Sequence, residues 1–119
     1  MNRSSLPSDD LPLIPTNEDV ILRRQLARST SKYFYEACDR ITQSLLYRCD
    51  WQIAIQVDMP VLIIACPDIS TYWQITSLIN EIGKKLKQIV NHAKIRIYSS
   101  NHKEMPFEVS LDELLDNEN

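Results

Sequence analysis

An unbroken apolar run over residues 60–67, Pro-Val-Leu-Ile-Ile-Ala-Cys-Pro, limits the possible folds of this chain more than any other segment. Six apolar residues between two prolines are too short a stretch for a helix, and three of them are β-branched, so the run predicts a buried strand. It lacks the alternation of a half-buried strand. We therefore expect it to lie in the middle of a sheet that is covered on both faces.

Two further strands follow from side-chain alternation and from connection lengths. Residues 51–57 alternate apolar and polar side chains and are separated from the central run by a very short link, which predicts an antiparallel hairpin. An amphipathic segment over residues 68–93 leads to another alternating stretch, residues 94–98. Because a strand–helix–strand crossover is right-handed and returns in the same direction, residues 94–98 should pair in parallel with the central run.

The predicted N-terminal helix is too long for the sheet. Thr16, followed by acidic residues, is typical of a helix start. A continuous helix over residues 17–48 would be about 48 Å long at 1.5 Å per residue, which exceeds the width of a domain of this size. The apolar stripe lapses over residues 28–32. We therefore expect the helix either to break near Ser29 to Ser31 or to project.

The predicted fold class is α+β: a two-layer sandwich in the order α-β-β-α-β with a short C-terminal strand and turn. Its sheet is mixed and three- to four-stranded, with two helices packed on one face. Residues 1–16 should form a flexible tail, residues 17–115 a single domain, and residues 116–119 a disordered acidic end. The opposite sheet face needs a cover from the tail, from the turn at Leu114 and Leu115, or from another subunit.

Composition and charge exclude several classes of function. The 119 residues include a single glycine, Gly83, which excludes the glycine-rich phosphate loops of Rossmann and Walker type. A net charge of −3 gives no overall attraction to nucleic acid or to an anionic membrane. We see neither a signal peptide nor an apolar run of the ~20 residues that cross a bilayer, so we expect a soluble, cytoplasmic protein without membrane insertion.

Catalytic and metal-binding constellations are not found in the sequence. The three cysteines, Cys38, Cys49 and Cys66, contain no C-x-x-C pair, and their odd number fits a reducing compartment. Cys66 ends the central strand, where nucleophiles are often placed, but His92 should lie at the opposite edge of the sheet. We expect no enzyme, no cofactor and no metal. A buried structural thiol is the favoured interpretation of Cys66, and a thiol-based sensor is a third hypothesis for the function.

An aromatic group supplies the predicted partner-binding residues. Its members lie close together along the chain: Tyr33, Phe34, Tyr35, Tyr47 and Trp51. Successive helical residues step ~100° around the axis, so the first three cannot all face one sheet. Tyrosine is enriched among interface anchors, although a wide core face with wet hydroxyls explains the group equally well. The leading hypothesis is a non-enzymatic adaptor or regulatory domain that binds a protein partner, or a second copy as a homodimer, through its first helix and exposed aromatics.

A basic segment supports the alternative of RNA or single-stranded DNA binding. Six cations occur without an intervening acidic residue: Lys84, Lys85, Lys87, Lys94, Arg96 and Lys103. Phosphate contacts would need these side chains to converge on one surface. The competing interpretation is a solvated face that supports the helix C-terminus, where the dipole favours lysine.

Overall fold

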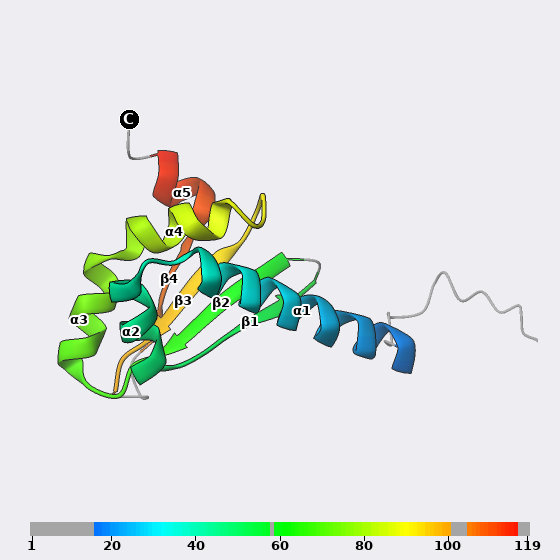
Figure 1. The fold of residues 1–119 in the computed structure, drawn as a ribbon, viewed down its shortest axis with the longest axis horizontal. Helices are drawn as coiled ribbons and strands as arrows, with labels where there is room; N and C mark the ends of the chain where they lie inside the picture. The colour runs from blue at the N-terminus through cyan, green and yellow to red at the C-terminus, as the bar shows by residue number, and fades with distance from the viewer. Residues whose placement is uncertain (1–15, 58, 101–104, 117–119) are drawn as a thin grey trace, which may run out of the picture.

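The computed structural model describes residues 16–57, 59–100 and 105–116, and they form an α+β fold as predicted (Figure 1). The helices are α1 (Asn17–Ala37), α2 (Arg40–Arg48), α3 (Ile69–Ser77), α4 (Ile79–Lys87) and α5 (Leu111–Asp116). The strands are β1 (Asp50–Gln56), β2 (Met59–Ala65), β3 (Lys94–Tyr98) and β4 (Phe107–Ser110). Asp116, assigned by the sequence to a disordered end, is thus the last residue of α5.

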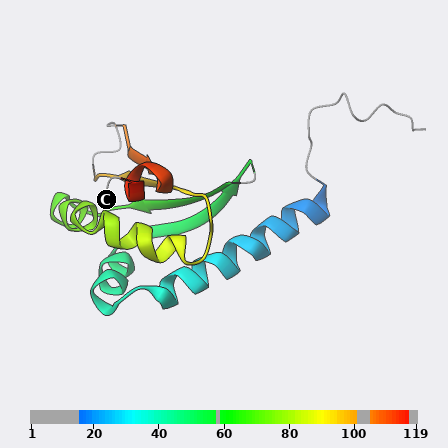
Figure 2. The same cartoon turned by 90° about the horizontal axis from the view of Figure 1, so that it is seen from above.

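The strand order is β1-β2-β3-β4, with β2 antiparallel to β1 and parallel to β3. Both predicted pairings are therefore confirmed, and β4 adds the short edge strand by pairing antiparallel with β3. Leu62 lies opposite Ile53 on one side and Ile95 on the other, and all three side chains are buried. These three side chains form the centre of the core. The helices α1, α2 and α4 lie over the face of the sheet from which they project (Figure 2).

Of the two predicted alternatives for the first helix, it projects and does not break near Ser29 to Ser31. α1 continues through these residues, and the Thr30 hydroxyl donates to the Leu26 carbonyl within the helix. The chain turns instead after Ala37, where the Asp39 carboxylate accepts the Thr42 N–H and starts α2. With 21 residues, α1 is about 31 Å long, and its N-terminal half extends past the sheet (Figure 2).

The crossover segment is two helices rather than the single helix that its stripe suggested. Asp68 caps α3 by accepting the Thr71 N–H. Near the end of α3, the Ser77 hydroxyl donates to the Gln74 carbonyl, a type of bond that competes with the helical ladder. The backbone leaves helical geometry at Leu78, where α4 begins in a new direction.

Gly83 has a packing role on α4. The Ser110–Glu113 capping box starts α5, which lies against α4 and brings Leu111 and Leu114 to the glycine. A Cβ at residue 83 would lie 2.5 Å from Leu114 Cδ2, so even alanine would force this leucine to move. The absence of a side chain therefore lets the two helices approach closely.

Of the three covers predicted for the opposite face of the sheet, the C-terminal turn does not supply one, because α5 packs on α4. The tail before Thr16 lies outside the described residues. No helix or strand among the described residues forms a layer over this face (Figure 2). Val61 is nevertheless buried on this face, while Ile63 and Ala65 are half-buried. This face of the sheet is therefore partly shielded from solvent and partly exposed to it.

Replacement of neighbouring β2 residues should separate the two faces energetically. Leu62→Ala should lower the free energy of unfolding by about 2–5 kcal/mol, because a fully buried leucine leaves a cavity. The matched control Ile63→Ala should cost clearly less, since that side chain is only half-buried. Urea unfolding followed by circular dichroism measures both, and equal losses would contradict the assignment of a partly open face.

Candidate functional site

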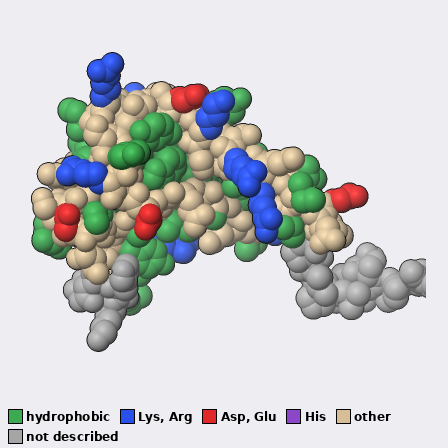
Figure 3. Space-filling model, turned by 60° about the horizontal axis from the view of Figure 1, so that its bottom comes forward, with side chains coloured by type: hydrophobic (Ala, Val, Ile, Leu, Met, Phe, Trp, Pro, Cys, Tyr) green, Lys and Arg blue, Asp and Glu red, His purple; other side chains and the backbone are tan. Residues whose placement is uncertain are grey.

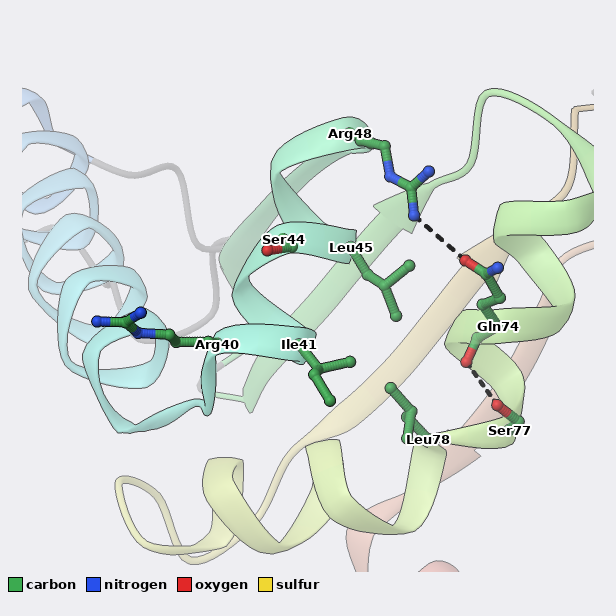
Figure 4. Close-up of a pocket in the computed structure, with 8 residues that line it drawn as sticks. All are labelled: Arg40, Ile41, Ser44, Leu45, Arg48, Gln74, Ser77 and Leu78. Atoms are coloured by element: carbon green, nitrogen blue, oxygen red, sulfur yellow. Dashed lines mark hydrogen bonds between the residues drawn. The ribbon is translucent and has the colours of Figure 1, made fainter.

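A groove lies between α2 and α3 in the described part of the surface (Figure 4). Its volume is about 500 Å³. The residues that line this α2–α3 groove are Arg40, Ile41, Ser44, Leu45, Arg48, Gln74, Ser77 and Leu78. The side chains of Ile41, Leu45 and Leu78 point into the space between the helices and give it an apolar floor (Figure 4).

The amphipathic pattern of α2 explains why this floor is apolar. Leu45 and Leu46 are buried toward the core, whereas Ile41, one turn earlier, is 69% exposed. Arg48 Nη2 donates to Gln74 Oε1 at 3.2 Å and joins the two walls across the groove. The helices therefore meet through a few side chains and leave apolar surface in contact with solvent.

A second hollow of about 430 Å³ lies on the other side of α2 and shares Arg40 and Ser44 with the groove. Its remaining lining residues are Tyr35, Gln43 and Tyr47. The Gln43 side chain donates to the Tyr35 carbonyl at 2.8 Å and holds the end of α1 against α2. We call the groove and this hollow together the α2 surface.

The charges of the α2 surface have one sign. Arg40 and Arg48 stand at the two ends of α2, about 12 Å apart along its axis. Arg48 points across the groove, and Arg40 points to the other side of the helix (Figure 4). Neither hollow is lined by an aspartate or a glutamate. The α2 surface thus combines apolar contacts with two separated cations.

The structure divides the predicted aromatic group. Tyr47 is 84% exposed and Tyr33 is 57% exposed, whereas Phe34 is fully buried. Trp51 holds two of the others: Phe34 meets it edge-on at 5.8 Å between ring centroids, and Tyr35 stacks on it at 5.9 Å. Phe34 therefore serves the core, and only Tyr35 and Tyr47 reach the α2 surface.

The predicted basic segment is also divided, between the two faces of the sheet. Its helical members, Lys84, Lys85 and Lys87, lie on α4 in the helix layer. Lys94 and Arg96 project from β3 on the opposite face, where they lie 3.7 Å and 2.8 Å from Glu108. The hydrogen bond from Arg96 is the main cause that lowers the pKa of Glu108. Lys103 lies outside the described residues.

Cys66 is buried, with 3% of its surface exposed. Its hydrogen bond to the Cys49 thiol, together with burial, raises the pKa of Cys66. His92 lies beside Asp112, before the start of β3, whereas Cys66 follows the end of β2. Because β2 and β3 are parallel, these positions are at opposite edges of the sheet, which agrees with the expected separation of the thiol from this histidine.

Comparisons with family models, with curated proteins and with solved structures found no match to this chain. Within the described ranges, no three His, Cys, Asp or Glu side chains are grouped so that they could hold a metal ion. No helix in those ranges has the length and hydropathy needed to span a membrane.

The caps of α2 and α3 predict a dependence of stability on pH. Bonds from the Thr42 and Thr71 N–H groups lower the pKa of Asp39 and of Asp68 below the usual 3.8. A depressed pKa in the folded state means that each carboxylate stabilises the fold above pH 3.8 and loses this effect as the pH falls through the folded pKa.

The double variant Asp39→Asn, Asp68→Asn keeps an oxygen acceptor at both caps but cannot titrate. Its unfolding midpoint should lie below that of the wild type at neutral pH, and the difference should shrink below about pH 4. Urea midpoints measured from about pH 6 to about pH 2 test this. If the urea midpoints of the two proteins instead fell in parallel as the pH was lowered, the prediction would be wrong.

Proposed function

We propose that this chain is a non-enzymatic adaptor or regulatory domain whose α2 surface binds an apolar segment of a protein partner that carries a carboxylate at each end. One observation carries the proposal. On the outer side of α2, the exposed side chains of Ile41 and Tyr47 lie between Arg40 and Arg48, with a hollow on each side. Free thiols at Cys38, Cys49 and Cys66 support a reducing compartment, the cytoplasm.

The side chains of the α2 surface indicate which kind of partner segment would bind there. Guanidinium groups form paired hydrogen bonds with carboxylates, and exposed aromatic and aliphatic side chains serve as anchors once they are desolvated. Carboxylates of a partner that reach both sides of α2 would meet Arg40 and Arg48, whose backbone positions are about 12 Å apart along the helix axis. An apolar residue between them would fill the space over Ile41, Leu45 and Leu78.

Catalysis and nucleic-acid binding have less support at this site. The lining of both hollows includes no histidine, cysteine or carboxylate that could serve as a general base. Phosphate binding would use a continuous basic surface, whereas the predicted cations lie on two faces and Lys94 and Arg96 are engaged by Glu108.

A designed helical peptide tests the proposal on isotope-labelled protein. The probe has leucines on one face and glutamates two turns apart, and the matched peptide has lysines in place of the glutamates. We expect amide resonance changes confined to the α2 surface, for the acidic peptide only. Ile41→Asp and Arg48→Glu should each weaken binding about tenfold or more, which corresponds to about 1.4 kcal/mol.

The control is Val57→Asp, which places the same new charge on an exposed residue of the β1–β2 turn. It should bind like the wild type. Equal affinity for the lysine peptide, or resonance changes on other faces, would overturn the assignment. A single-stranded RNA oligonucleotide that binds at low salt and displaces the acidic peptide would favour the nucleic-acid alternative.

A second candidate, self-association through α1, rests on the projecting half of that helix. Leu22 and Leu26 are more than half exposed there, and Tyr33 extends the same stripe two turns later. Lys and Arg side chains form a row on the part of the molecule that α1 forms (Figure 3). In an antiparallel pair centred near residue 25, Glu18 of one copy would lie opposite Lys32 of the other, which supports a second copy as the occupant.

Analytical ultracentrifugation tests self-association. The wild type should form a dimer at high micromolar concentration, and Leu22→Glu, Leu26→Glu should shift it to monomer, because charges would enter the apolar seam. Ile21→Glu is the control, since this exposed residue lies about 100° around the helix from Leu22. A wild-type monomer at every concentration would remove this candidate.

A further inference from the structure

Cys49 and Cys66 occupy facing positions at the base of the β1–β2 hairpin. The last paired residues are Asp50 and Ala65, so the next step of the antiparallel register places the two cysteines opposite one another. Cys49 has the extended dihedral angles φ −102° and ψ 162°, which continue the direction of the strand. Both side chains belong to the buried core cluster.

The pair has a spacing that suits a disulfide. The N–H of Cys66 donates to the Tyr98 carbonyl at 3.0 Å, so this residue directs its backbone to β3 and makes no ladder bond to β1. Facing residues of this non-hydrogen-bonded kind have Cα atoms about 4.5 Å apart. Disulfides span Cα distances of about 4.4–6.8 Å. Each thiol is close enough to shift the pKa of the other.

We propose that Cys49 and Cys66 are a reversible oxidation site that forms an internal disulfide when the protein meets a peroxide. The Cys49 sulfur attacks one peroxide oxygen as the O–O bond breaks, and the hydroxide that leaves takes up the thiol proton to give water. The sulfur is thereby oxidised to a sulfenic acid. The Cys66 thiol then attacks that sulfur, the S–O bond breaks, and water leaves. In sum, two thiols and one hydrogen peroxide yield one disulfide and two waters.

The surroundings fit these roles. A cavity of about 190 Å³ lies beside Cys66, with Arg48, Asp50, Ala65, Pro67 and Ser100 as its other lining residues, so a small peroxide has room next to the pair. The thiol that lines this cavity is Cys66, which faces Cys49. The hydrogen bond from Cys66 lowers the pKa of Cys49, and Arg48 acts in the same direction, against burial and the charges of Asp68 and Asp50. This favours Cys49 as the attacking sulfur.

Cys38 provides a built-in comparison. It is buried like the other two, and burial with the nearby Asp39 raises its pKa to about 11. Trypsin should release it on peptide 33–40, whereas Cys49 and Cys66 fall together on peptide 49–84, which has no internal lysine or arginine. One digest therefore reports on both the pair and its control.

The experiment treats the folded, reduced full chain with stoichiometric hydrogen peroxide, then alkylates it in denaturant and maps it by mass spectrometry. We expect peptide 49–84 to lose two hydrogens and to resist alkylation, with full recovery after dithiothreitol. Peptide 33–40 should remain alkylated. Further cleavage after Met59, the single methionine of peptide 49–84, should leave its two parts joined until they are reduced.

Two variants complete the test. Cys38→Ser should form the disulfide at the wild-type rate, and Cys66→Ser should instead accumulate sulfenic acid at Cys49, detected with dimedone. Mapping of the wild type decides the question even if Cys66→Ser fails to fold. Alkylation of both Cys49 and Cys66 after peroxide, equally fast oxidation of Cys38, or disulfide formation only in urea would each overturn the proposal.

Discussion

Burial of the helix-facing side chains of β2 is the interaction on which the rest of the structure depends. Leu62 and Ile64 are fully buried between β1 and β3, and the helix layer closes over them through Phe34, Ile82 and Leu86. Each such side chain contributes on the order of 2 kcal/mol when it leaves water. Since α2 and α3 are joined directly to the ends of this hairpin, the same burial sets where the walls of the α2–α3 groove stand.

The strands and their pairing could be predicted because they follow from local alternation and from connection lengths. The helix start at Thr16 could also be predicted from local sequence, since a cap needs only one side chain and the next turn. The helix breaks were not predictable in this way. Thr30 can satisfy its hydroxyl inside a helix, so a polar stretch alone does not end α1, whereas packing on β1 decides where the chain turns.

The candidate site was only partly contained in the sequence. The groove forms because α2 and α3 lie side by side. The spacing of apolar residues along the sequence does not indicate which helices become neighbours. The exposed Tyr47 was found by its residue type, but Phe34 was included with it because sequence does not show which side of a helix faces the sheet. The cysteine pair had an available signal that the sequence analysis missed. Cys49 and Cys66 bracket the two strands of a predicted hairpin at equal distance, which places them face to face.

The arrangement of strong and weak contacts links these two features. The hairpin is held by a full ladder and a buried core, whereas the walls of the groove are joined across the gap by an exposed hydrogen bond from Arg48 to Gln74. An exposed bond of this kind contributes little, so the walls are held mainly by the side chains that each helix buries in the shared core, such as Leu45 and Ile75. A bond between Cys49 and Cys66 would tie the end of α2 to the chain that enters α3, directly beneath both walls. If the proposed binding at the α2 surface holds, oxidation of this pair would act on the groove through the part of the core that both walls share.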